Sequence, residues 1–155
     1  MDTSAPALLF VAGNACVLPF WGAMLVAPGS RITERWLRSP WICAPFAIAY
    51  VLVFIASFGS LLEAARAPSF QSLVTLIGTP LGTNLAWLHY LTGDLFVGRW
   101  IYWDSRPRSI GRPWLTLVFL LGLTFCPIAL LVYLVLRSRH PRSDQLVDPN
   151  ADREG

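Results

Sequence analysis

Three ionisable side chains, His89, Asp94 and Arg99, lie within eleven residues of an otherwise apolar stretch that runs from Leu85 to Asp104. An imidazole and a carboxylate exchange protons, and a guanidinium binds polar oxygens, so the three could serve acid-base chemistry or a proton relay. A charged side chain near the centre of a bilayer costs about 2.5–3.5 kcal/mol on insertion scales. We therefore expect these groups to be functional or paired, and to face inward around a chamber.

The helical period places these side chains on different faces of one helix. Trp87, Tyr90 and Asp94 fall on one stripe, so Tyr90 could donate a hydrogen bond to Asp94. His89 and Arg99 each lie five positions from Asp94, which is about 140° around the helix at roughly 100° per residue. Their partners are therefore expected to come largely from other helices.

Helical rise, counted from the ends of antiparallel helices, gives the depths of the available partners. Asn14 falls at about the depth of His89, and Tyr50 and Thr124 fall at about the depth of Asp94. Structural alternatives remain open for all three ionisable groups. These are a hydrogen-bonded strut for the carboxylate, a neutral imidazole that donates to a facing carbonyl, and a guanidinium that reaches lipid phosphate.

Composition and hydropathy indicate that the helix belongs to an integral membrane protein. Of the 155 residues, 55% are hydrophobic and 14% are charged, and the mean hydropathy is +0.54. About 20 apolar residues are needed to cross a hydrocarbon core of roughly 30 Å. We predict an all-α domain, 1–140, with four transmembrane helices in an up-and-down bundle, followed by a disordered tail, 141–155. The predicted spans are 7–27, 44–62, 81–103 and 114–136.

The connections between these spans differ in character. The first and third loops, 28–40 and 104–113, carry six arginines and are flanked by tryptophans, as expected beside lipid headgroups. We place these two loops in the cytoplasm and both termini outside. The second connection, 63–80, has helical apolar spacing after Ser69 as its cap, which predicts a short helix that lies in the interface or acts as a lid over a cavity.

The run HYLTGDLFVGRWIYWDSR, from His89 to Arg106, resembles the signature of the abscisic-acid-deficient-four-like family, small four-helix membrane proteins that include plant neoxanthin synthase. The resemblance implies an isomerase that acts on a carotenoid or related isoprenoid by acid-base chemistry. In the plant case an epoxide becomes an allenic alcohol, which requires neither a redox cofactor nor a metal.

The resemblance also implies roles for individual residues. Asp94 is the expected proton donor and His89 the expected base, because a dry groove with one acid and one base would suffice for the isomerisation. Other side chains are expected to contact the substrate, with Arg99 or Arg106 binding a terminal ring hydroxyl. The remaining members of this predicted substrate-binding set are Tyr90, Trp87, Asn14 and Tyr50.

Two other classes of function compete with the enzyme. One is a non-catalytic membrane protein that binds a carotenoid or lipid, or assists assembly of a partner complex. The other is a proton-coupled carrier with Asp94 as relay, which is disfavoured because four helices show no inverted repeat. An absorption spectrum of an organic extract would separate the carrier from the other two.

Charge and residue usage bear on partners and location. The net charge of +3 is spread over loops and tail, so membrane lipid and an isoprenoid ligand are expected partners and nucleic acid is not. All twelve basic residues are arginine, which we take as a bacterial bias. We expect a multi-pass protein of a bacterial cytoplasmic membrane with an uncleaved first helix, and Cys16, Cys43 and Cys126 as small apolar fillers.

Overall fold

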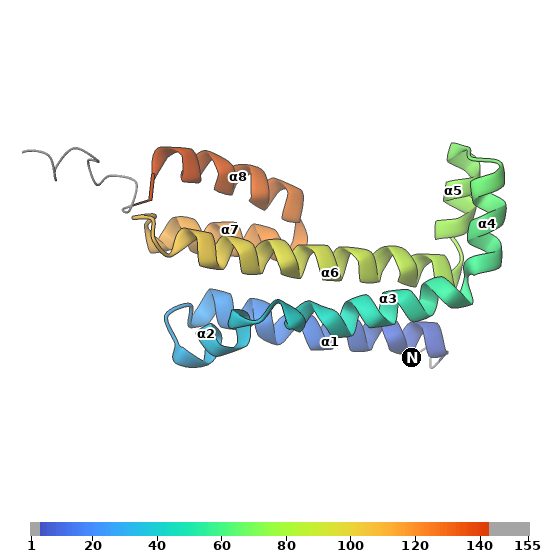
Figure 1. Ribbon diagram of the computed structural model, residues 1–155, viewed down its shortest axis with the longest axis horizontal. Coiled ribbons are helices and arrows are strands. Elements are labelled where there is room, and N and C mark those ends of the chain that lie inside the picture. Colours follow the sequence, from blue (N-terminus) through green and yellow to red (C-terminus); the bar gives the residue numbers. More distant parts are fainter. Residues whose placement is uncertain (1–3, 143–155) are drawn as a thin grey trace, which may run out of the picture.

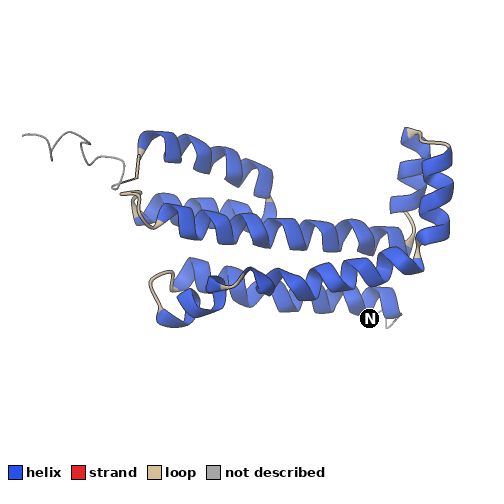
Figure 2. Ribbon diagram, in the orientation of Figure 1, coloured by secondary structure: helices blue, strands red, loops and turns tan. Residues whose placement is uncertain are grey.

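The computed structural model describes residues 4–142, and within that range the only regular secondary structure is helical (Figures 1 and 2). The predicted all-α class is thereby confirmed. Most of the predicted tail, 143–155, lies outside the described residues. The elements are α1 (Ala5–Val26), α2 (Arg31–Arg38), the 3-10 helix η1 (Pro40–Cys43), α3 (Ala44–Ala56), α4 (Phe58–Arg66), α5 (Phe70–Ile77), α6 (Pro80–Ser105), α7 (Arg112–Thr124) and α8 (Cys126–Arg139).

The longest helix, α6, forms the axis of the fold and packs against α1, α3, α5, α7 and α8. Its start is fixed by Thr79, whose hydroxyl accepts a hydrogen bond from the Gly82 amide at 3.0 Å, and by Pro80 in the first turn. α1 and α3 run along α6 (Figure 1). The α4–α5 pair covers one end of this assembly, and α2 lies at the other end.

The predicted span 44–62 is divided at Ser57. α3 stops at Ala56, and α4 leaves at a steep angle to pack beside α5 (Figure 1). α5 matches the short helix predicted for the second connection. Its cap is Ser69, which exchanges hydrogen bonds with Ser72 in a capping box.

The predicted span 114–136 is wrong as a single helix. The chain breaks at Phe125, and α7 and α8 pack against each other as a hairpin that returns to its starting end (Figure 1). Pro127 favours the break because it cannot donate the backbone hydrogen bond that a continuous helix would need. At about 1.5 Å per residue each arm is roughly 20 Å long, shorter than a hydrocarbon core. The expected up-and-down bundle of four single spans is therefore not the arrangement of the described residues.

A network around Asp104 closes the hairpin. One carboxylate oxygen, Oδ2, accepts hydrogen bonds from Tyr133 Oη at 2.7 Å, Arg137 Nε at 2.9 Å and Arg108 Nε at 3.1 Å. Arg108 also donates to the carbonyl of His140 at 2.8 Å. Tyr133 and Arg137 belong to α8, so the network ties the end of α8 to the end of α6.

Trp21 joins the three helices around the middle of the fold. Its indole is buried, and it lies in a slot formed by Gly98 of α6 and Gly122 of α7. A Cβ atom at either glycine would lie within 2.8 Å of the Trp21 ring. The two glycines therefore permit the close approach of α1 to α6 and α7.

By length and hydropathy, one described helix, α1, could cross a membrane by itself. The bent pair formed by α2 and residues 40–56, with an angle of 76°, would add a second span. α6 has 26 residues, which is long enough, but its polar side chains lower its hydropathy.

We predict that Gly98→Ala destabilises the fold by about 1–3 kcal/mol, because the new methyl group would collide with the buried Trp21 ring. Gly93→Ala on the same helix is the matched control, since a Cβ there meets no atom within 4 Å. Thermal unfolding of the two purified variants in detergent measures the difference. Equal midpoints would contradict the wedge role of Trp21.

We predict that Asp104→Asn costs about 3–5 kcal/mol, because it leaves the buried Arg108 guanidinium without its counter-charge. The Arg108 side chain is 5% exposed. Glu34→Gln is the control at the same end of the molecule, since its ion pair with Arg106 is exposed and should contribute about 0–1 kcal/mol. Chemical unfolding of both variants tests the contrast, and similar losses would contradict it.

Stability should also depend on pH through Asp104, which lies one residue beyond the predicted span 81–103. Burial raises the pKa of this carboxyl, but hydrogen bonds from Tyr133, Arg108 and Arg137 outweigh burial, so the pKa is lowered overall. The stabilisation is then fully present above the unfolded pKa of about 3.9 and is lost as the pH falls through the folded value. The unfolding midpoint of the native protein should drop below about pH 4, and Asp104→Asn should lack that part of the drop.

Candidate functional site

His89 lies at the junction of two adjoining cavities, of about 200 and 260 Å³, and Tyr50 lines both of them with it. The imidazole comes from α6 and the phenol from α3, with ring centroids 6.0 Å apart. The smaller cavity is completed by Ala47, Thr92 and Gly93. The larger is completed by Leu61, Leu73, Leu76, Ile77, Gly82, Leu85, Ala86 and Tyr90. We call the two cavities together the His89 groove.

The walls of the groove are apolar apart from a few groups. The Thr92 hydroxyl donates a hydrogen bond within α6, to the Leu88 carbonyl at 2.7 Å. A Cβ at Gly93 would meet no atom within 4 Å, so the glycine leaves the floor open there. Three side chains in the groove have acid-base chemistry to offer, Tyr90 and the pair His89 and Tyr50, and only the pair lines both cavities.

One wall of the larger cavity is α5, whose Leu73, Leu76 and Ile77 face His89 across the groove. Phe70 at the start of this helix is 83% exposed. Phe70 belongs to the apolar stripe that the spacing predicts, so that stripe is only partly covered, although Leu73 and Ile77 line the cavity. Of the two alternatives for this segment, the lid is the one that a cavity beneath the helix favours.

Asp94 does not line the groove, although it is close enough to His89 for an electrostatic interaction with the imidazole. Its carboxyl interacts with the thiol of Cys126 at the apex of the α7–α8 hairpin, and it lines neither cavity that contains His89. The predicted hydrogen bond from Tyr90 is not formed, because the Tyr90 side chain is 58% exposed and turns toward His89. The predicted acid and base are therefore not brought together in one cavity.

Arg99 is bound to protein carbonyls at the α2 end of the fold. Its Nε donates to the Leu37 carbonyl at 2.9 Å, and its Nη2 donates to the Arg38 carbonyl at 2.8 Å. Trp103 Nε1 donates to the same Leu37 carbonyl at 2.7 Å. The guanidinium thus caps the C-terminus of α2. Partners for Arg99 and Asp94 come from other elements, as their spacing on α6 predicts.

The expected inward orientation holds for two of the three ionisable groups. Asp94 and Arg99 are partly buried, whereas His89 is exposed at the mouth of the groove. Asn14 lies near the predicted depth, because Gly13 packs on Leu91, but its amide donates within α1 to the Phe10 carbonyl at 2.8 Å.

The aromatic residues predicted to contact the substrate do not all line the groove. Trp87 packs on Phe10 of α1, with ring centroids 5.0 Å apart, and lines neither cavity of the groove. Tyr90 lines the larger cavity, and Tyr50 lines both. Tyr50 was predicted at the depth of Asp94 along α6. It lies instead at the depth of His89, five residues earlier on that helix.

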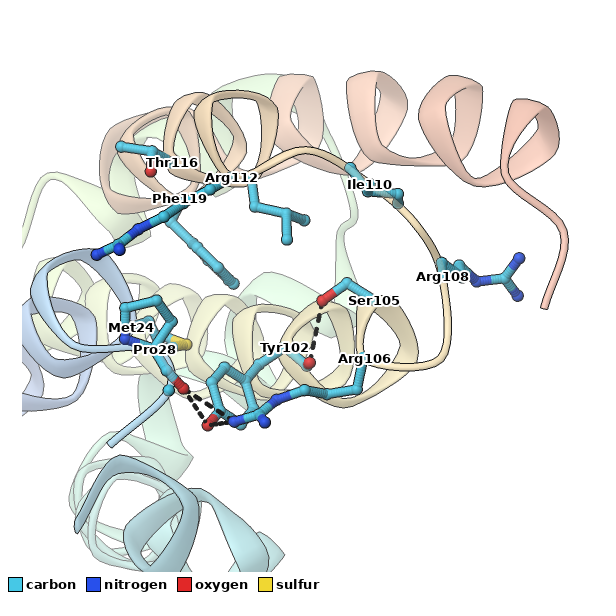
Figure 3. Close-up of a pocket in the computed structure, with 12 residues that line it drawn as sticks. Met24, Pro28, Tyr102, Ser105, Arg106, Arg108, Ile110, Arg112, Thr116 and Phe119 are labelled. Carbon is cyan, nitrogen blue, oxygen red and sulfur yellow. Dashed lines mark hydrogen bonds between the residues drawn. The ribbon is translucent and has the colours of Figure 1, made fainter. Parts of the chain in front are cut away.

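Arg106 lies at the other end of α6, about 25 Å from His89 by helical rise. It donates to Glu34 Oε1 at 2.9 Å. It also donates to the Pro28 carbonyl at 2.9 Å and to the Tyr102 hydroxyl (Figure 3). It lines a separate cavity of about 260 Å³ between α1, α6 and α7, which we call the loop-end cavity. The groove and Arg106 therefore form two sites.

Two parts of the candidate site were not predicted from the sequence, Cys126 beside Asp94 and the α5 residues that line the groove. Cys126 was interpreted as an apolar filler, although its position before Pro127 marks a helix start beside which a carboxyl group could bind. The α5 residues that line the groove were not among the predicted site residues, although a lid over a cavity was one of the two alternatives for this helix. Their apolar face was the available signal, since an amphipathic helix must cover something.

The comparisons with known proteins agree with the resemblance in the α6 run. A family model described as ABA DEFICIENT 4-like matches residues 8–133. Over an alignment of 142 residues the chain is 26% identical to Protein ABA DEFICIENT 4, chloroplastic, of Arabidopsis thaliana. The alignment covers 88% of this chain and 63% of that protein. The chain thus spans less than two thirds of the relative's length, and no solved structure matches it. On the strength of the family match over most of its length, the chain belongs to the ABA DEFICIENT 4-like family.

Proposed function

We propose that this protein is a membrane isomerase that binds a carotenoid or related isoprenoid along the His89 groove and moves protons on it. The observation that carries the proposal is the pair of adjoining apolar cavities that share His89 and Tyr50. An elongated apolar groove with a few placed polar groups suits a long hydrocarbon ligand with polar ends.

A membrane location is supported by the outer surface. Leu18 of α1, Ile48 and Ile55 of α3, and Leu131 of α8 are each more than half exposed. Soluble monomers rarely expose contiguous apolar patches larger than a few hundred Å². We propose that lipid covers these faces and that α5 lies at the membrane surface over the groove.

The proposed chemistry needs one proton delivered and one removed. In the isomerisation that the family resemblance implies, a proton added at an epoxide oxygen accompanies cleavage of a C–O bond, and a proton leaves a polyene carbon. No electrons are gained or lost overall. We propose that Tyr50 donates the first proton and that His89 accepts the second, because both line the same cavities.

Asp94, the expected proton donor, has a different position. Its contact with Cys126 connects the middle of α6 to the hairpin apex. We propose that it supports the site by holding this apex, and that a direct role as acid requires access to the groove. The same contact favours the second candidate function, a non-catalytic membrane protein that binds a carotenoid or lipid, because Asp94 then serves packing alone.

We predict that His89→Gln and Tyr50→Phe each lower product formation at least tenfold, because positioned proton transfer contributes roughly 10²–10⁴-fold to rate. The test is an isomerisation assay on carotenoid extracts of cells that express each variant. His140→Gln, which changes a histidine outside the groove, is the control. Full activity in both groove variants would exclude the proposed acid-base pair.

Binding without catalysis has its own readout. The proposal predicts that organic extraction of the purified protein yields a carotenoid or isoprenoid, and that Leu76→Trp, which fills the larger cavity, lowers the bound amount. Bound ligand with no product from any tested substrate would select the non-catalytic candidate. An extract with no isoprenoid, from cells that make it, would contradict both candidates.

The variant Asp94→Asn distinguishes two roles of Asp94, holding the hairpin apex and donating a proton to the substrate. Because Asn keeps the shape and can still accept a hydrogen bond from Cys126, we predict that the variant folds and retains at least a tenth of the activity. Loss of more than a hundredfold in activity, with unchanged thermal stability, would instead assign Asp94 as the acid. Thermal unfolding and the isomerisation assay on the same preparation give both numbers.

A further inference from the structure

We propose that the loop-end cavity binds the phosphate group of an anionic membrane lipid. The site lies about 25 Å along α6 from His89 by helical rise, and it is separate from the proposed isomerase chemistry. It is formed where the end of α1, the end of α6 and the start of α7 meet (Figure 3).

The charge of the lining selects an anion. Twelve residues line the cavity, and they include three arginines and neither Asp nor Glu. Guanidinium groups bind phosphate oxygens in paired hydrogen bonds, so this lining matches a phosphate better than a neutral ligand. The cavity of about 260 Å³ is slightly below the usual range for a whole ligand, about 300–1,000 Å³, so it fits a headgroup better than an entire lipid.

The three arginines differ in how much of their charge is already matched. Arg106 pairs with Glu34 at 2.9 Å, and Arg108 pairs with Asp104 at 3.1 Å. Arg112 has no ion pair with a carboxylate of the described residues, and the one hydrogen bond that its side chain makes to them is long, 3.4 Å from Nη2 to the Val26 carbonyl. Arg112 is therefore the guanidinium with the most to gain from an anion.

The view into the cavity supports this assignment. Arg106 and Arg112 extend from α6 and α7 toward the segment that contains Pro28, whereas Arg108 points away from both (Figure 3). Thr116 follows Arg112 by one helical turn and lines the same cavity, so its hydroxyl is a further donor on that wall. α7 begins without a side-chain cap, which leaves the positive end of its dipole near the cavity.

The rest of the lining indicates that the phosphate belongs to a lipid. Met24, Leu115 and Phe119 provide an apolar wall to the same cavity. A free inorganic phosphate would gain nothing from that wall, whereas the glycerol and first methylenes of a phospholipid would contact it. Trp114 beside the cavity is 54% exposed, as expected of an aromatic side chain at headgroup level.

The test uses the purified full chain in neutral detergent, titrated with short-chain phosphatidylglycerol, phosphatidylcholine or inorganic phosphate. A ligand that binds the folded state raises the unfolding midpoint with concentration, which gives an apparent affinity. Phosphatidylglycerol should raise the midpoint far more than the other two. Arg112→Gln should weaken the apparent affinity about fivefold, because each arginine near an anionic surface contributes about that factor.

Controls keep folding apart from binding. Arg35→Gln removes an exposed arginine of α2 that does not line the cavity, and it should leave the affinity unchanged. Thr116→Val keeps the size of the side chain and should weaken binding about twofold to fivefold by removing a hydrogen bond. His89→Gln should have no effect, so a failure of the proposed isomerase chemistry would not mimic a failure here.

Three results would overturn the proposal. An equal shift from phosphatidylcholine would show that the cavity does not select an anion. An equal shift from inorganic phosphate would assign the cavity to free phosphate in place of a lipid. A fully retained phosphatidylglycerol response in Arg112→Gln, with the unliganded midpoint unchanged, would place the binding elsewhere on the protein.

Discussion

A single carboxylate oxygen ties the end of α8 back to the end of α6. Asp104 Oδ2 receives donors from Arg108, Tyr133 and Arg137, and the last two belong to α8. A helix that crossed to the far side of the fold could not deliver those groups to the end of α6. Since partly buried charges need partners, the ion network and the fold-back of α8 require each other. The apex of the hairpin then lies near the middle of α6, where Cys126 meets Asp94.

The short hairpin divides α6 into two halves with different neighbours. Along the half that ends at Asp104, α6 is covered by α7 and α8, and the loop-end cavity forms between α1, α6 and α7. Along the half that begins at Pro80, α3 and α5 cover α6, and the His89 groove forms beneath α5. A fourth full-length helix would have run past both halves. The half-length hairpin thus allows one helix to serve an apolar site at one end and a basic site at the other.

The elements that sequence reasoning predicted well are those whose signal is local. α1 and α6 were predicted within a few residues because each is one long helix, and α5 was predicted from its apolar spacing and Ser69 cap. The single span predicted over 114–136 was wrong for a physical reason. Hydropathy measures the affinity of a segment for lipid and carries almost no information about where a helix ends. Pro19 lies inside α1 without ending it, whereas Pro127 lies at the break between α7 and α8. The hairpin is closed by a distant partner, Asp104, which no local window of the sequence includes.

The same reasoning explains why the candidate site was only half predictable. An ionisable residue stands out in the sequence when its neighbours are apolar, so His89, Asp94 and Arg99 were recognised as candidates without a structure. Helical rise then gave the depth of possible partners, but it gives no direction around the axis, and each five-residue step on α6 turns the side chain by about 140°. His89 and Asp94 consequently face different neighbours, Tyr50 on α3 and Cys126 at the hairpin apex. A reaction that needs an acid and a base at one substrate must take them from one cavity. Because Tyr50 and His89 share theirs, the proton donor is better sought on α3 than one turn further along α6.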